Sequence, residues 1–256
     1  MGKLIKSYGC FLAVAMFSLV LLVGNSRDVL AAYEGGDVSN GGTITGTVKL
    51  VGDVPDASTL KVDKDQATCG HDDLPSEALM VSGDSSLQNA VVSITNISKG
   101  KKFAGGTPAI DQKGCVFRPH VAMIPQGSSI ELLNSDDVMH NLHSWSMKNT
   151  AFNEGVAAHG NISKTFEFPE TVKVTCDVHK WMTSWLIVQA NPYYAITDAN
   201  GKYKLEGVPA GTYTVQAWQE SLGNATQEVT VAAGGEAKAD FELEKKEKKR
   251  RERKKH

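Results

Sequence analysis

The sequence predicts an all-β protein. Helical periodicity is almost absent after residue 31, whereas short β-branched runs recur and end at Gly, Asn, Asp or Pro. The regular spacing of these runs is typical of antiparallel sandwiches and not of alternating strands and helices. We expect strands, in chain order, at residues 43–51, 90–97, 116–124, 129–134, 162–168, 172–176, 184–189, 194–197, 203–206, 211–218, 227–232 and 236–243.

Residues 1–31 have the layout of a secretory signal peptide. Lys3 and Lys6 precede an apolar run over residues 11–23, and small residues for cleavage lie at 29–31. The run is short for a membrane span, with an uncleaved anchor as the alternative. Cys10 comes before the apolar run, whereas a lipid-attachment cysteine would follow it. We therefore expect a periplasmic or extracellular protein.

Export would leave three cysteines, namely Cys69, Cys115 and Cys176. An odd number in an oxidising compartment is explained if Cys69 and Cys115 form a disulfide and a metal keeps Cys176 as a thiolate. The alternative is a second metal site made by Cys69, His71, Cys115 and His120. The sequence has no Cys-x-x-Cys-His motif, so covalent c-type haem is not indicated.

The charge is strongly segregated along the chain. The net formal charge is −2, but residues 245–256 contain nine lysines and arginines against two glutamates. The remainder of the exported chain is therefore acidic, which suits solubility and the steering of basic partners. The basic tail is expected to be a solvated, disordered end. The alternative is docking to an anionic surface, either lipid headgroups or an acidic redox partner, while nucleic-acid binding is disfavoured for an exported chain.

The most informative motif is Cys176-x2-His179-x2-Met182, which begins thirty-six residues after His140. Two imidazoles, one thiolate and one weak axial thioether are the ligands of a mononuclear blue-copper site. Zinc also accepts thiolate and imidazole, but a thioether is not among its usual ligands. The alternative without a metal is that these residues are ordinary members of a sandwich core, since a lone cysteine is often a buried hydrophobic residue.

The region from 117 to 188 resembles the cupredoxins, which are blue copper proteins such as plastocyanin and, most similar here, amicyanin. The resemblance rests on the segment 139–143, the strand leading into Cys176, and a ligand loop of amicyanin length. It implies a Greek-key sandwich with one type 1 copper, in which His140, Cys176 and His179 are ligands and Met182 is the axial ligand. It also implies that the residue next to the first histidine, Asn141, joins the ligand segments by hydrogen bonding.

Three other histidines are candidates for lesser roles. His143 lies three residues after His140, so the two side chains point to opposite faces of a strand. The resemblance selects His140, and His143 is the alternative ligand. His120 is expected to be structural or to support the site, with direct metal contact as the alternative. His159 is expected to be an exposed loop residue, with a pH-sensitive contact near the copper loop as the alternative.

Residues 191–244 carry a second signature. The runs 197–205 and 208–215 resemble the carboxypeptidase regulatory-like, transthyretin-like β-sandwich, which implies a fold and not a chemistry. Asn200-Gly201 supplies the positive φ angles of a two-residue hairpin turn. Asp198 and Asn200 are expected to serve this turn, with calcium binding as the alternative.

The expected domains are a cupredoxin-like domain at 40–190, the smaller immunoglobulin- or transthyretin-like sandwich at 191–244 and the tail at 245–256. A boundary near residues 190–192 is favoured because Pro192 cannot donate to a strand ladder. Residues 43–97 also resemble the opening strands of the second sandwich. In the alternative arrangement they complete it, and the cupredoxin-like domain is inserted between its two parts.

The leading functional hypothesis is an exported type 1 copper protein that carries single electrons to a redox partner. The ring edge of His179 is the expected electron exit, with Trp181 and Met139 as an apolar contact patch around it. One rival is a copper storage or delivery protein, and another is a structural interaction module in which the metal only staples the fold. No enzymatic activity is expected, because neither a nucleophile–base pair nor an open metal position is evident.

Overall fold

The computed structural model describes Gly2 and residues 32–245, and it confirms the all-β sandwich prediction. Apart from Gly2, the expected signal peptide lies outside the described residues, as does all but the first residue of the expected basic tail. In the described part, the helical element is the short α1 (Gln66–Cys69). None of the described helical residues forms a segment long and apolar enough to cross a bilayer.

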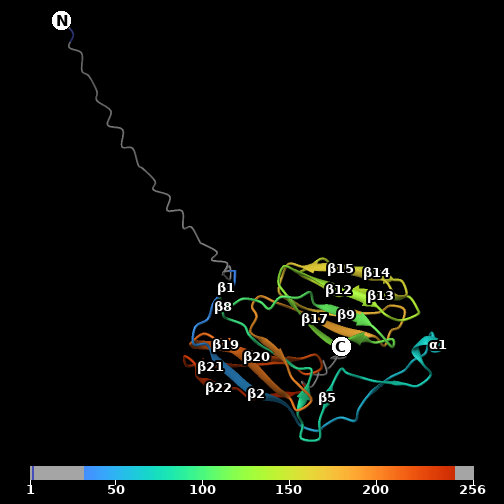
Figure 1. Ribbon diagram of the computed structural model, residues 1–256, viewed down its shortest axis with the longest axis horizontal. Coiled ribbons are helices and arrows are strands. Elements are labelled where there is room, and N and C mark those ends of the chain that lie inside the picture. Colours follow the sequence, from blue (N-terminus) through green and yellow to red (C-terminus); the bar gives the residue numbers. More distant parts are fainter. Residues whose placement is uncertain (1, 3–31, 246–256) are drawn as a thin grey trace. The chain divides into compact units, whose positions relative to one another are not determined.

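One sandwich is built from the middle of the chain (Figure 1). Its four-stranded sheet has the order β10-β9-β12-β15, and its five-stranded sheet has the order β11-β17-β16-β13-β14. The strands of the first sheet are β10 (Phe117–Arg118), β9 (Ala109–Gln112), β12 (Ser128–Asn134) and β15 (Asn161–Phe166). Those of the second are β11 (Val121–Pro125), β17 (Thr183–Gln189), β16 (Glu170–Thr175), β13 (His140–Ser144) and β14 (Asn153–Val156).

Alternating apolar residues close the core of this sandwich. In β12, Ile130 and Leu132 are fully buried while their neighbours are half-exposed, which is the period-2 pattern of a strand with one face on the core. The single strand expected at 116–124 is divided into β10 and β11. Pro119 lies between them, and a proline cannot donate the ladder hydrogen bond that a continuous strand would need.

The second sandwich takes strands from both ends of the described chain. One sheet has the order β18-β7-β20-β21, and the other has β19-β2-β22 with β23 also paired to β2. In Figure 1 the blue β2 lies beside the orange and red strands from the far end of the sequence. The strands are β18 (Tyr194–Ile196), β7 (Val91–Ile94), β20 (Gly211–Gln219), β21 (Gly223–Val231), β19 (Lys202–Val208), β2 (Gly42–Val51), β22 (Glu236–Lys238) and β23 (Phe241–Glu244).

The long strand β2 is the centre of its sheet, and another backbone segment approaches it closely at Gly46. A Cβ atom at Gly46 would lie 1.8 Å from the carbonyl oxygen of Ala239, so only glycine fits there. β2 pairs with β19 antiparallel and with β22 and β23 in parallel. The strand pairing required by the inserted arrangement is thus present, and a simple division at residue 190 does not describe it. Residues 42–51 and 91–94 belong to the same sandwich as residues 194–244.

The turn after β18 differs from the expected two-residue hairpin. β18 and β19 lie in different sheets, and only Gly201 of the pair Asn200-Gly201 has a positive φ, of 67°. The Asp198 carboxylate accepts hydrogen bonds from the backbone N–H groups of Asn200 and Lys202, at 2.8 and 2.9 Å. Asp198 therefore serves the turn, as Asp commonly does.

A shared apolar cluster joins the two sandwiches. Val121 and Ile187 of the five-stranded sheet pack with Val91 of β7, and all three are buried. Short ladders occupy the connections, namely β1 (Glu34–Gly36) with β8 (Lys99–Lys101), β3 (Thr59–Leu60) with β4 (Leu74–Pro75), and β5 (Met80–Val81) with β6 (Leu87–Gln88). The β3–β4 connection contains α1 and covers the loop at residues 176–182, since Asp65 contacts His179. We call residues 60–74 the lid.

Candidate metal centre

Neighbouring strands bring the first histidine and the cysteine together. His140 opens β13, and Cys176 directly follows β16, which pairs with β13 through His143 and Thr175. The backbone N–H of Asn141 lies 3.4 Å from Cys176 Sγ. Two residues thirty-six positions apart therefore meet because antiparallel neighbours place them at the same end of one sheet.

The loop after Cys176 turns back upon itself. The backbone N–H of Met182 donates to the carbonyl of His179 at 2.9 Å, and the N–H of Cys176 donates to the carbonyl of Met182 at 3.3 Å. The N–H of His179 points to Cys176 Sγ at 3.3 Å. This closed loop carries the His179 ring back to the cysteine and buries the Met182 side chain in the same core.

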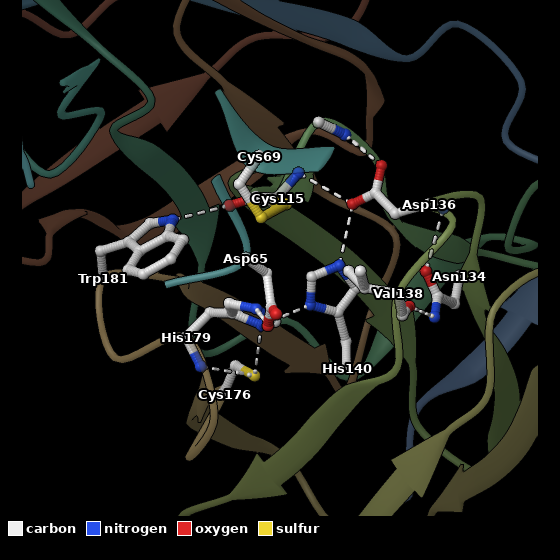
Figure 2. The surroundings of a disulfide bond; sticks show 11 residues. Asp65, Cys69, Cys115, Asn134, Asp136, Val138, His140, Cys176, His179 and Trp181 are labelled. Carbon is white, nitrogen blue, oxygen red and sulfur yellow. Dashed lines mark hydrogen bonds and ion pairs between the residues drawn. A yellow bond between two sulfur atoms is a disulfide. The ribbon is translucent and has the colours of Figure 1, made fainter. Parts of the chain in front are cut away.

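The donor atoms of three predicted ligands converge (Figure 2). His140 Nδ1 lies 2.9 Å from His179 Nδ1, which in turn lies 3.7 Å from Cys176 Sγ. All three atoms lie within 4.8 Å of one another. The exposed fractions are 0% for both histidines, 2% for Cys176 and 1% for Met182. Cys176 is the free cysteine of the described residues.

A carboxylate holds the outer nitrogen of each imidazole. Asp136 Oδ2 lies 2.8 Å from His140 Nε2, and Asp65 Oδ2 lies 2.8 Å from His179 Nε2. Carboxylates in this position fix the tautomer and orientation of a metal-binding histidine. Sequence reasoning missed both residues. Asp136, four residues before His140, was within reach of such reasoning, whereas no local signal connects Asp65 with a histidine 114 positions away.

When both rings are neutral and donate to these carboxylates, their inner nitrogens face one another as acceptors. A neutral imidazole carries one N–H, and the carboxylates require it on Nε2 of both His140 and His179. Each Nδ1 then presents a lone pair to the other across 2.9 Å inside a buried site. Two buried lone pairs repel unless a cation lies between or beside them. The chemistry of the donor set therefore fits a metal ion bound to both Nδ1 atoms and Sγ.

The pKa of His140 also favours a neutral ring. The pKa of His140 is lowered mainly by burial, which outweighs the opposing effect of the Asp136 carboxylate. A lowered pKa keeps the imidazole neutral, and the neutral form is the one that binds metals.

Cys69 and Cys115 are joined by a disulfide that supports both carboxylates. Cys69 belongs to α1, whose preceding residue Asp65 has a left-handed backbone with φ 49°. The backbone N–H of Cys115 donates to Asp136 Oδ2 at 2.8 Å, and the Cys115 carbonyl accepts from the Trp181 indole at 2.9 Å. Figure 2 shows this disulfide beside the two histidines.

Asn141 links the two ligand segments in the manner that the resemblance implied. Its side-chain oxygen accepts a hydrogen bond from the backbone N–H of Asp177 at 2.7 Å. Its side-chain amide donates to Asn153 on β14. The residue therefore connects β13, the ligand loop and the neighbouring strand.

The remaining histidines lie outside the converging group. His143 faces away from it and bonds Asp177 Oδ1 at 3.0 Å. His120 is paired with Glu220 of the second sandwich. His159 is exposed and lies 2.9 Å from Asp137. His71 is exposed as well, and the disulfide occupies both cysteines of the alternative second site.

The ring edge of His179, the expected electron exit, does not reach the surface. Its ring is 0% exposed, and Asp65 of the lid covers its outer nitrogen. Trp181, expected in a contact patch, is 8% exposed and lies edge-on to His179 with a ring-centroid distance of 5.1 Å. The lid is a long insertion whose contact with the loop cannot be read from local sequence. Met139 is exposed, but the patch expected around His179 does not form.

Comparisons with known proteins give one family match. The sequence model of the carboxypeptidase regulatory-like domain matches residues 187–244, which contain β18 to β23. No curated protein sequence is significantly similar to this chain.

Several solved structures resemble part of the chain. The Cu-containing nitrite reductase NirK from Thermus scotoductus SA-01 is 20% identical over 35% of this chain and 24% of its own, with a TM-score of 0.31. A Cu(I) structure of an amicyanin variant is 18% identical over 34% and 87%, with a TM-score of 0.31. A purple cupredoxin from Nitrosopumilus maritimus is 21% identical over 32% and 99%, with a TM-score of 0.29. The chain thus spans about a quarter of the nitrite reductase.

Proposed function

We propose that the protein is an exported type 1 copper protein that carries single electrons. His140, Cys176, His179 and Met182 would hold one copper ion. The observation that carries this proposal is the buried convergence of the two Nδ1 atoms with the free Cys176 Sγ. Two imidazoles and one thiolate with a thioether nearby in sequence are the donor set of such a site.

When bound, copper in this donor set would supply a reversible one-electron couple. The protein's contribution is a rigid and dry cage. Backbone N–H groups of Asn141 and His179 point at Cys176 Sγ and fix its position beside the two imidazoles. Asp136 and Asp65 hold the two rings, so that little rearrangement accompanies a change of charge.

Burial of the site favours a carrier over an enzyme. The four proposed ligands are each at most 2% exposed, so a substrate has no direct approach to the metal position. The same enclosure disfavours storage or delivery, because copper release would require the lid to open. An extracellular or periplasmic location is supported by the Cys69–Cys115 disulfide, since such bonds persist in oxidising compartments.

The test is a Cu(II) titration of the mature chain, followed by optical absorption and EPR. The expected result is an intense blue thiolate charge-transfer band at one copper per chain. The band is absent in Cys176→Ser and retained in His159→Asn, which changes an exposed histidine outside the cluster. A colourless product would refute the type 1 site. A blue site that cannot be reduced and reoxidised would instead favour a structural metal.

A further inference from the structure

The lid is held against the rest of the fold at few points. Of residues 60–74, Val62 and Cys69 are buried, and the others are exposed or partly exposed. The flanking strands β3 and β4 pair with each other over two residues each, so this ladder joins the lid mainly to itself. Leu60 and Leu74, at its two ends, line a partly enclosed cavity of about 210 Å³ beside Met182. The ends of the lid are therefore not closely packed on the sandwich.

The polar contacts of the lid are also mostly internal. The backbone N–H groups of Thr68 and Cys69 donate to the carbonyl of Asp65, both at 2.9 Å. In the described part of the chain, one hydrogen-bonded pair of residues 60–74 reaches beyond residues 58–76. It joins Asp65 Oδ2 to His179 Nε2 at 2.8 Å, and the Asp65 side chain is 39% exposed. A pair that water reaches on one side adds little to the stability of the closed lid.

The Cys69–Cys115 disulfide is the strongest of these connections. Cys115 is fully buried in the framework of the site, where its N–H donates to Asp136 and its carbonyl accepts from the Trp181 indole. Cys69 lies in the helical turn that Asp65 precedes, so the bond fixes this turn beside the two histidines (Figure 2). The covalent link thus limits how far Asp65 can move from His179.

The lid is the movable part of the enclosure of the site. The outer nitrogen of His140 is covered by Asp136, which is 8% exposed and also accepts hydrogen bonds from the Gly114 and Cys115 backbone. The outer nitrogen of His179 is covered by the weakly attached lid, although the ring itself is 0% exposed. Weakly attached segments open at a lower free energy than a packed core does. An ion that exchanges with solvent would therefore pass beside His179.

We propose that the lid is the gate for metal entry and release, and that the Cys69–Cys115 disulfide holds it closed. This inference rests on the proposed metal site. When both cysteines are thiols, the lid turns about the β3–β4 ladder and uncovers His179. When the disulfide is present, Asp65 stays on the ring and the metal is retained.

The change between the two states is a thiol–disulfide exchange. A protein disulfide takes two electrons and two protons from Cys69 and Cys115, so that it becomes a dithiol and they become a disulfide. A dithiol reductant carries out the reverse exchange. Cys69 is 7% and Cys115 is 0% exposed, so the closed lid shields the bond from attacking thiols. Metal would accordingly load before the disulfide forms.

The first test needs no metal. Diethyl pyrocarbonate acylates imidazole nitrogens that solvent reaches, and the modified residues are located by peptide mass spectrometry. Metal-free, disulfide-bonded wild type is compared with Cys69→Ala/Cys115→Ala, using the exposed His159 as the reference. We expect His179 to react at least about tenfold faster in the double variant, since the lid opens locally. His140 should remain unmodified, because Asp136 still covers it.

Two variants separate the disulfide from other sources of protection. Val62→Ala removes the buried apolar contact of the lid but keeps the disulfide, and His179 should stay protected. Leu205→Ala weakens the core of the other sandwich and should leave both histidines protected. Reaction of His179 in either of these variants would overturn the proposal. Equal protection of His179 in wild type and the double variant would do the same. Joint reaction of His140 and His179 in the double variant would show that the bond supports the whole site, which also contradicts a gate.

The second test follows metal release. Wild type and the double variant are loaded to equilibrium with Cu(II), and the decay of the blue band is recorded after EDTA is added. Alanine is used in place of cysteine so that no additional thiol binds copper. Release should be at least about tenfold faster in the double variant, and equal rates would refute the gate. A wild type that never turns blue would refute the copper site, whereas the reactivity of His179 tests the lid independently.

Discussion

Asp136 offers a test of the site's framework that does not depend on any metal. Its carboxylate is 8% exposed and accepts hydrogen bonds from the backbone N–H groups of Gly114 and Cys115, at 2.6 and 2.8 Å. The same group holds His140 Nε2 at 2.8 Å. Asp136→Asn keeps the shape of the side chain but replaces one acceptor oxygen with an NH₂ group. That donor would then face either the Gly114 N–H or both the Cys115 N–H and His140.

The expected loss of unfolding free energy follows from the hydrogen bonds that an asparagine side chain cannot make at this position. The less costly orientation turns the amide oxygen towards Cys115 and His140, so that one charge-assisted hydrogen bond, from the Gly114 N–H, is lost. Such a bond is worth about 1.5–3 kcal/mol, so the variant should lose about 1.5–3 kcal/mol of unfolding free energy, because the stranded donor remains buried. The assay is urea unfolding of the metal-free, disulfide-intact protein at pH 7, followed by circular dichroism.

The neighbouring residue provides the matched control. Asp137 pairs with His159 at 2.9 Å, but the two side chains are 83% and 64% exposed. Asp137→Asn should therefore change the unfolding free energy by less than about 0.5 kcal/mol. Equal losses in the two variants, or a loss below about 1 kcal/mol for Asp136→Asn, would refute the argument that the buried carboxylate organises the site.

Three further predictions concern stability and tuning. The disulfide spans 46 residues, so replacing Cys69 and Cys115 with serine should cost about 4 kcal/mol, measured by denaturant unfolding; an unchanged midpoint would contradict this. Although burial acts to raise the pKa of Glu170, hydrogen bonds from residues 146–149 lower it to about 2, from an ordinary value of 4.5. The stability that this carboxylate contributes is therefore complete above about pH 4.5 and is lost as the pH falls through about 2. Glu170→Gln should cost about 1–2 kcal/mol at pH 7 and progressively less below pH 4, and a pH-independent difference would argue against it. If copper binds as proposed, Met182→Leu should keep the blue band and change the reduction potential in spectroelectrochemistry, because the axial ligand and local polarity tune it. An unaltered potential would remove Met182 from the axial position.

Local sequence was sufficient where short spacing controls geometry. The Cys-x2-His-x2-Met spacing allows a tight loop, and the loop closes by hydrogen bonds between residues at most six positions apart. The alternation of apolar residues predicted strands because one face of each strand must be buried. The opposite orientations of His140 and His143 follow from the same period of two, and one is buried while the other bonds Asp177 outside the core.

Partners that meet only through the fold were beyond local reasoning. The pairing of Asp65 with His179 joins residues 114 positions apart, and that of His120 with Glu220 joins residues 100 apart. A strand's pattern records which of its faces is buried, but not which strand lies beside it. For this reason the second sandwich's use of β2 remained one of two possibilities until the pairing was seen.

For this protein, the sequence alone determined the strand-rich class, the four candidate ligands and their order, and the segments that could place them. These depend on burial periodicity and short loops, which are local properties. Tertiary structure alone decided that a disulfide-anchored lid covers His179 and that carboxylates hold both rings. Those contacts depend on the packing of distant segments, because hydrogen bonds and exposure are set only when the whole chain has folded.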